Sequence, residues 1–201
     1  MFAMYISYCL AMNSTAFLAD LNHRLSSIET TVQQLLPLPE AVLNHKPASE
    51  SWSVLECLGH LNRYGRYYLP ALKQVLGHSG PVVGPTQDVT FSWLGRKSYE
   101  MIRPENRKAH KTLGRMNPAR SHLTGAVLQE FQEQLSDLKA LLPLAYHTNL
   151  NRKAVPIEFF RLLKLQVGEA LLFVVAHMQR HVQQAQRAAM TATSKAVQQL
   201  A

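Results

Sequence analysis

Cysteine is scarce in this chain of 201 residues, which contains only Cys9 and Cys57. The two form no Cys-x-x-Cys pair and are too few for a disulfide framework. Proteins without structural disulfides suit a reducing compartment. We therefore expect a cytoplasmic location.

Long hydrophobic runs are absent as well. The apolar opening MFAMYISYCLA has no Lys or Arg ahead of it, unlike a signal peptide, and it is shorter than the roughly 20 residues that span a bilayer. The later run ALLFVVA is bounded by Glu169 and His177. We therefore expect no membrane partner, an extended or loosely packed leader over residues 1–12, and a single domain over residues 13–201.

Acidic residues are few, since 13 Asp and Glu stand against 21 Lys and Arg, which gives a formal net charge of +8. The excess is concentrated between residues 96 and 120, where cations outnumber acids. The nearby aromatics, Trp93 and Tyr99, cluster at one end of this segment, whereas a nucleic-acid platform interleaves aromatics with charges. We interpret the segment as a solvated basic connection and expect no nucleic-acid partner.

No stretch shows alternating polarity bounded by hairpin turns, so we expect no strands. Apolar residues recur instead at spacings of three and four, which is typical of the buried face of a helix. One such stripe, from about residue 13 to residue 36, consists of Leu18, Leu21, Leu25, Ile28, Val32 and Leu35. A second, from about residue 123 to residue 142, consists of Leu128, Phe131, Leu135, Leu138 and Leu142.

Another helix is predicted over residues 53–77. Ser53 and Glu56 have the spacing of a capping box, in which each side chain accepts a hydrogen bond from the backbone of the other residue. Pro70 should kink this helix or end its first half, because proline lacks the backbone donor.

The last predicted helix covers about residues 166–190. A long connection over residues 77–122 separates the middle helices and holds at most a short helix near residues 91–102. Four main helices with two long connections predict an all-α protein, a four-helix bundle.

Three histidines lie on the seams of two of these helices. His177 and His181 are four residues apart, so their rings stack on one helix face about a turn apart and can reach one ion. His60 has a comparable position in the helix over residues 53–77, and facing helices of a bundle can bring it opposite the pair. Buried histidines also serve as hydrogen-bonded core residues, so spacing alone leaves metal binding and packing both open.

The segments SWSVLECLGHL and GEALLFVVAHMQRHVQQAQR resemble the DinB/YfiT-like superfamily. In that family a Trp-Ser helix start precedes a His-Leu pair, and a late helix carries His-x-x-x-His-x-x-Gln. The resemblance implies an antiparallel four-helix bundle, a divalent metal on His60, His177 and His181, and a homodimer. It also implies that Gln184, the trailing glutamine, supports the ligands.

Two neighbours of the histidines are candidate catalytic residues. Glu56 lies one turn before His60 and could orient its ring or act as a base, although the capping box competes for its carboxylate. Tyr64 lies one turn after His60 and either faces an open coordination position or packs in the bundle. Cys57, also near His60, is a possible fourth ligand.

A metal on three imidazoles has open positions and lowers the pKa of a bound water or thiol. The sequence therefore predicts a small-molecule enzyme, either an S-transferase that uses a low-molecular-weight thiol or a hydrolase, with zinc or nickel as the favoured metal. The basic segment over residues 96–120 would suit an anionic thiol. The alternative is a non-enzymatic bundle with a structural metal or a partner-binding role.

Overall fold

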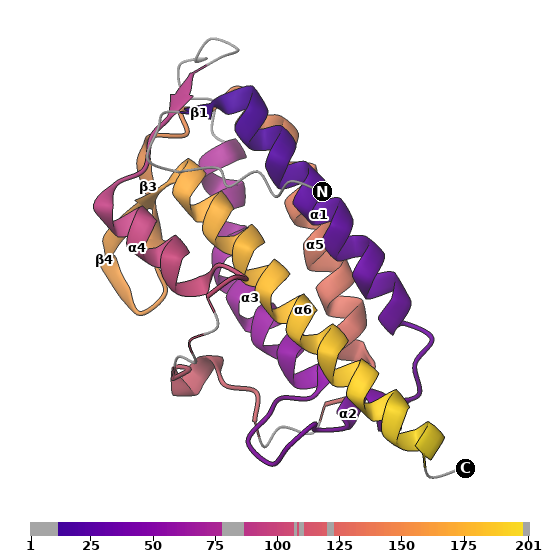
Figure 1. The fold of residues 1–201 in the computed structure, drawn as a ribbon. Coiled ribbons are helices and arrows are strands. Elements are labelled where there is room, and N and C mark those ends of the chain that lie inside the picture. Colours follow the sequence, from indigo (N-terminus) through magenta and orange to yellow (C-terminus); the bar gives the residue numbers. More distant parts are fainter. Residues whose placement is uncertain (1–11, 78–86, 107, 109–110, 120–122, 199–201) are drawn as a thin grey trace.

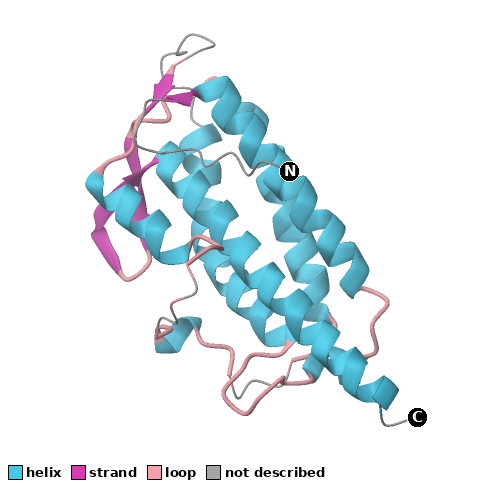
Figure 2. Cartoon of the chain, viewed as in Figure 1, coloured by secondary structure: helices cyan, strands magenta, loops and turns pink. Residues whose placement is uncertain are grey.

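Four long helices lie alongside one another in the computed structural model, which describes residues 12–77, 87–106, 108, 111–119 and 123–198 (Figure 1). They are α1 (Ser14–Leu35), α3 (Val54–Gly77), α5 (Ala126–Ala145) and α6 (Val167–Gln198). Helices α1 and α3 each contact both α5 and α6. The protein is therefore mostly helical, as predicted (Figure 2).

The predicted apolar stripes form the core between these helices. Helix α1 begins after Asn13, whose side chain accepts a hydrogen bond of 2.9 Å from the backbone of Thr15. Every residue of the predicted stripes on α1 and α5 is buried: Leu18, Leu21, Leu25, Ile28, Val32, Leu35, Leu128, Phe131, Leu135, Leu138 and Leu142. The periodicity therefore identified both buried faces correctly.

The other two long helices differ from their predictions mainly in length. Helix α3 runs through Pro70 and reaches Gly77, so the proline does not end it. Pro70 is exposed, on a face where the missing backbone hydrogen bond is not buried. Helix α6 continues to Gln198, several residues beyond the predicted end near residue 190. Among the described residues, no helix is long and apolar enough to cross a membrane.

Shorter elements occupy the connections. Helix α2 (Glu40–Asn44) precedes α3, and helix α4 (Trp93–Ile102) confirms the predicted short helix near residues 91–102. A 3-10 turn, η1 (Gly114–Met116), follows α4. Strand β1 (Met12–Asn13) pairs with β2 (Asp88–Val89). The predicted leader, apart from Met12, lies outside the described residues.

The expectation of no strands is wrong for the segment before α6. Strands β3 (Lys153–Ile157) and β4 (Phe160–Gln166) form an antiparallel hairpin. Their register shifts twice, between Lys153 and Val155 and between Pro156 and Ile157. Because each shift interrupts the two-residue period, and because residues 160–164 are all exposed, the sequence shows no alternation to detect.

The buried carboxylate of Glu169 joins α4 to the start of α6. Its two oxygens accept hydrogen bonds from the backbone N–H of Ser92 (2.5 Å) and of Gln166 (2.8 Å). Ser92 is the N-cap of α4, and its own hydroxyl accepts from Gly95. The chain between the two helices is thereby fixed close to the hairpin.

We expect Gly95→Ala to destabilise the protein by about 1–3 kcal/mol, the usual cost of overpacking a core. A Cβ at Gly95 would overlap the carboxyl group of Glu169, which its two hydrogen bonds hold in place. Gly125→Ala is the matched control, since a Cβ there meets no atom within 4 Å. Urea unfolding of both variants is the measurement, and equal midpoints would contradict the prediction.

Candidate metal centre

The position of His60 is set by the N-terminus of α3. The backbone N–H of Ser53 donates to Oε2 of Glu56 (2.9 Å), and the N–H of Glu56 donates to Oγ of Ser53 (3.1 Å). This reciprocal pair is the predicted capping box. It begins the helix so that His60, one turn further on, is buried at the contact with α6.

His177 and His181 come from α6, four residues apart on one face, and their ring centroids are 4.8 Å apart. The ring of His60 lies 5.0 Å from that of His177 and 4.6 Å from that of His181. One ligand nitrogen from each residue lies within 4.8 Å of the other two. The structure therefore brings the three histidines together in a group that could hold a metal ion.

Hydrogen bonds on the outer side of two rings determine which nitrogen faces the group. Nδ1 of His60 lies 2.8 Å from the carbonyl oxygen of Met116, and Nδ1 of His181 lies 2.9 Å from Oε1 of Gln184. Both oxygens accept, so each Nδ1 donates and leaves a lone pair on Nε2 in the neutral ring. Such oxygen partners orient histidine ligands in metal sites.

All three imidazoles are neutral near pH 7. Burial lowers the pKa of His60 to about 4. Burial, together with the neighbouring His60, lowers the pKa of His181 to about 3. Burial and the two other histidines lower the pKa of His177 well below its ordinary value. Because a protonated imidazole cannot bind a metal, these shifts leave the group ready to accept an ion.

The donor set fits a divalent transition metal. In a tetrahedral zinc site, Zn–N bonds of about 2.0–2.1 Å place two ligand nitrogens roughly 3.3 Å apart. The Nε2 atoms of His60 and His177 are 3.1 Å apart. Three imidazoles suit zinc, nickel, copper or iron and are poor ligands for magnesium or calcium.

Cys57 is not a member of this group, so the fourth-ligand alternative is wrong. Burial raises the pKa of its thiol, which disfavours the thiolate that metals require. The described residues therefore offer three protein ligands. That number is typical of catalytic zinc sites, in which a coordination position stays open.

Aromatic rings enclose the histidines from two sides. Trp52 lies 4.8 Å from His60 and 5.6 Å from His181, centroid to centroid. Tyr64 lies 4.9 Å from His60 and 4.5 Å from His177. The Trp-Ser motif places Trp52 at the start of a helix, and nothing in the local pattern shows that this side chain reaches α6.

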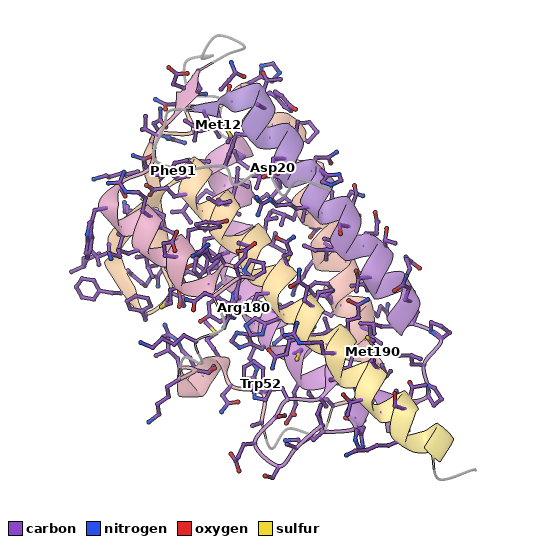
Figure 3. The ribbon with its side chains drawn as sticks, viewed as in Figure 1. Met12, Asp20, Trp52, Phe91, Arg180 and Met190 are labelled. Atoms are coloured by element: carbon purple, nitrogen blue, oxygen red, sulfur yellow. The ribbon has the colours of Figure 1, made fainter. Side chains whose placement is uncertain are left out.

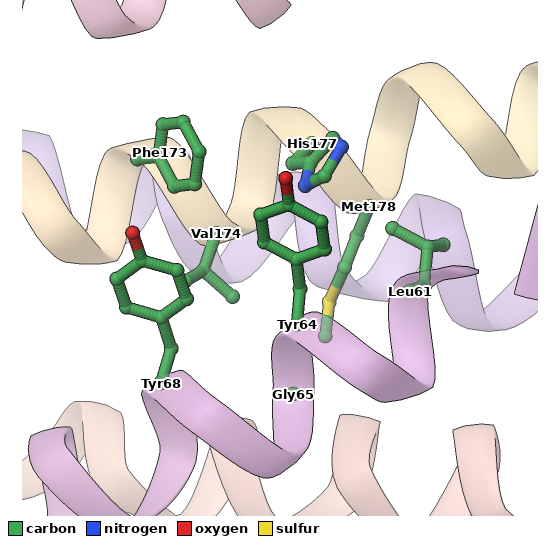
Figure 4. A pocket seen from close by; sticks show the side chains of 8 residues that line it. All are labelled: Leu61, Tyr64, Gly65, Tyr68, Phe173, Val174, His177 and Met178. Carbon is green, nitrogen blue, oxygen red and sulfur yellow. The ribbon is translucent and has the colours of Figure 1, made fainter. Parts of the chain in front are cut away.

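A small cavity extends from the histidines along the contact between α3 and α6. Figure 4 shows the hydroxyl end of Tyr64 beside His177. The volume is enough for about one water molecule. Its lining consists of Leu61, Tyr64, Gly65, Tyr68, Phe173, Val174, His177 and Met178.

Glu158, which the sequence did not single out, is buried behind this cavity. Its carboxylate accepts a hydrogen bond of 2.6 Å from Tyr68, and Arg115 donates to its backbone oxygen. Burial, followed by the negative charge of Glu158, raises the pKa of Tyr64. Glu158 lies at the turn of the hairpin, which the sequence analysis did not predict. A prediction of that turn would have been needed to place Glu158 beside Tyr68.

Both carboxylate oxygens of Glu56 have partners outside the group of three histidines. Oε2 accepts from Ser53, and Oε1 forms an ion pair of 2.7 Å with Lys46. Glu56 does not belong to the metal-binding group. The capping use of this side chain is therefore realised in the structure, while Tyr64 is the candidate catalytic residue that contacts the histidines.

The basic segment over residues 96–120 passes beside the histidines. Arg180 of α6 donates to the backbone oxygens of Arg103 (3.1 Å), Asn106 and Lys108 (3.0 Å), near the C-terminal end of α4 (Figure 3). Beyond this point, Met116 accepts from His60. The described parts of the segment are thus held beside the site, in part through its backbone oxygens. Of its cationic side chains, Arg96 donates to Phe91, Arg103 pairs with Glu100, and Arg115 donates to Glu158.

Comparisons with known proteins agree with this geometry. The family model described as DinB superfamily matches residues 25–185, a range that contains all three histidines and Gln184. Comparisons with curated proteins and with solved structures found no match. Because the matched range covers well over half of the sequence, the chain belongs to the DinB superfamily.

Proposed function

We propose that this protein is a metal-dependent enzyme with an antiparallel four-helix bundle of the DinB type. His60, His177 and His181 hold a divalent ion, zinc or nickel by preference, which serves a small-molecule reaction. The observation that supports this proposal is the convergence of three neutral imidazoles, one nitrogen from each within 4.8 Å of the others. Gln184 and the carbonyl of Met116 hold two of the rings in position.

The reaction is either transfer of a low-molecular-weight thiol to an electrophile or hydrolysis, and we favour thiol transfer. A divalent ion at this site supplies a lowered pKa for a bound thiol or water. Tyr64 keeps its proton on Oη, because burial and Glu158 raise its pKa. Its hydroxyl, which hydrogen-bonds to the Glu158 carboxylate in the absence of substrate, is the donor that can turn to a substrate beside His177.

The basic segment supports the choice of an anionic thiol. Arg115 is exposed, and it contributes to the local charge at Tyr64. A cation close enough to lower the pKa of Tyr64 favours a ligand that carries a carboxylate. A homodimer and a cytoplasmic location complete the proposal, the first from the family resemblance and the second from the cysteine content.

The test compares metal-loaded and metal-free protein in two assays: conjugation of glutathione and cysteine to chlorodinitrobenzene, and hydrolysis of nitrophenyl acetate. We expect the conjugation rate of metal-loaded protein to exceed that of metal-free protein by about 100-fold or more. Such a factor is usual for general acid–base catalysis and for activation of a nucleophile by a metal. Circular dichroism of the metal-free protein serves as the control for folding. A metal-free protein that is unfolded would instead support a structural ion, and equal rates would contradict metal-dependent chemistry.

A further inference from the structure

Large apolar side chains are exposed around the β3–β4 hairpin. The exposed fractions are 57% for Phe159, 47% for Phe160, 83% for Leu162, 42% for Leu163 and 68% for Trp93. Trp93 belongs to α4, which contacts β4, and the hairpin lies at the edge of the molecule opposite α1 (Figure 1). We name the four hairpin residues and Trp93 the apolar tip. Apolar residues gathered in this way mark an interaction surface.

Cations surround the apolar tip. Arg152 and Lys153 lie at the start of the hairpin, and Arg161 and Lys164 lie on β4. The only acid of the hairpin is Glu158, which is buried and hydrogen-bonded to Tyr68. An open groove of about 470 Å³ lies between the hairpin and the C-terminal part of α3, and its lining consists of Gln74, Val75, Arg152, Ala154, Pro156, Arg161 and Lys164.

The turn of the hairpin is held against α3, so the tip is presented in one position. Tyr67 donates to the backbone oxygen of Ile157 (3.2 Å), and Tyr68 donates to the carboxylate of Glu158 (2.6 Å). Arg115 donates to the backbone oxygen of Glu158. A surface fixed before binding loses less conformational entropy when it binds.

We propose that the apolar tip and the cationic groove dock this protein on an anionic lipid bilayer. The apolar side chains enter the boundary between headgroups and acyl chains, and Arg152, Arg161 and Lys164 contact lipid phosphates. The interaction is peripheral, requires no spanning helix, and is independent of the metal site. The expectation of no membrane partner agrees with the absence of a spanning helix among the described residues, and the proposed peripheral contact is an addition to it.

Charge and side-chain type favour a bilayer over the two other occupants. In a two-fold dimer the patch would face itself, and the four hairpin cations would oppose their copies. Nucleic acid would satisfy the cations and could stack on Phe159, Phe160 and Trp93, but it would leave the exposed aliphatic side chains of Leu162 and Leu163 without an apolar partner. A bilayer with anionic headgroups satisfies both kinds of residue.

The test measures co-sedimentation of the full chain with phosphatidylcholine vesicles, with and without phosphatidylglycerol. We expect binding that requires phosphatidylglycerol and weakens as salt is added. Leu162→Asn should lower the partition coefficient about tenfold, since a leucine no longer leaves water. Arg161→Glu with Lys164→Glu should abolish binding. Met190→Asn is the matched control, since Met190 is 65% exposed on α6, far from the tip (Figure 3).

Trp93 gives a second measurement that does not depend on substitution of the hairpin. Brominated acyl chains should quench its fluorescence, and Trp93→Phe should remove the quenching while Trp52 still emits. The proposal is overturned if Leu162→Asn binds vesicles as the parent does or if phosphatidylglycerol has no effect. It is equally overturned if light scattering without lipid shows a dimer that Leu162→Asn dissociates. Binding of RNA with the same affinity in the parent and in Leu162→Asn would overturn it as well.

Discussion

The His177→Ala variant is expected to lose its metal, while the parent chain, purified with zinc or nickel present, carries about one ion. Zinc peptides with four ligands bind with apparent free energies of about 10–16 kcal/mol, which averages to about 2.5–4 kcal/mol per ligand. Loss of one ligand from the group of three should therefore weaken binding by about 10²–10³-fold. Elemental analysis of the dialysed protein and competition with a chromogenic chelator are the measurements.

Controls separate loss of a ligand from loss of the fold. His147→Ala alters an exposed histidine and should retain the metal. Gln184→Ala removes the hydrogen-bond partner of His181 and should weaken binding by about 10–100-fold, as outer partners of ligands do. Because His177 is buried, His181→Ala at a half-buried position provides a second ligand variant with less effect on packing. Equal metal content in the parent and both ligand variants would refute the site.

The fluorescence of Trp52 offers a second measurement of metal binding at the three histidines. Its ring lies 4.8 Å from His60, so a paramagnetic ion such as nickel or copper at the histidines should quench its emission. Trp93, the other tryptophan, is exposed on α4, and its replacement by Phe leaves Trp52 as the single reporter. Quenching that persists in His177→Ala at the same ion concentration would contradict binding at this group.

The long helices were predictable because each buries a stripe that the sequence displays. Leu21, Leu25 and Ile28 follow the helical spacing, and all are buried against neighbouring helices. The same logic placed His177 and His181 on one face of α6. The capping pattern of Ser53 and Glu56 likewise described a local interaction, which the sequence contains in full.

Other features depend on contacts between segments that are distant in sequence. The hairpin has an irregular register and an exposed β4, so its strands carry neither alternation nor a typical turn signal. Glu158 is buried with its carboxylate hydrogen-bonded to Tyr68, which lies 90 residues earlier. Trp52 contacts His181 only because α3 and α6 pack together. Each of these requires the tertiary arrangement and not a local pattern.

The metal-free protein is expected to lose stability steeply as pH falls from about 7 to 5. An unfolded histidine titrates near pH 6.5, whereas burial lowers the pKa of folded His60 to about 4 and of His181 to about 3. Burial lowers the pKa of His177 as well. The unfolded state therefore binds more protons in this range, and the free energy of unfolding decreases with falling pH. His60 and His181 each contribute about 2 kcal/mol over these two pH units, and His177 adds to the loss in the same direction.

A loss of that size approaches the whole stability of many domains, so urea unfolding of metal-free protein at pH 7, 6 and 5 should show a large fall in midpoint. His60→Gln removes one titrating group and should reduce the pH dependence by about a third, whereas His147→Ala should retain it in full. Saturating zinc should oppose the loss at pH 7 and 6, because the ion binds only the folded protein with neutral imidazoles. A midpoint that is constant from pH 7 to 5 would show that these histidines are not buried neutral groups.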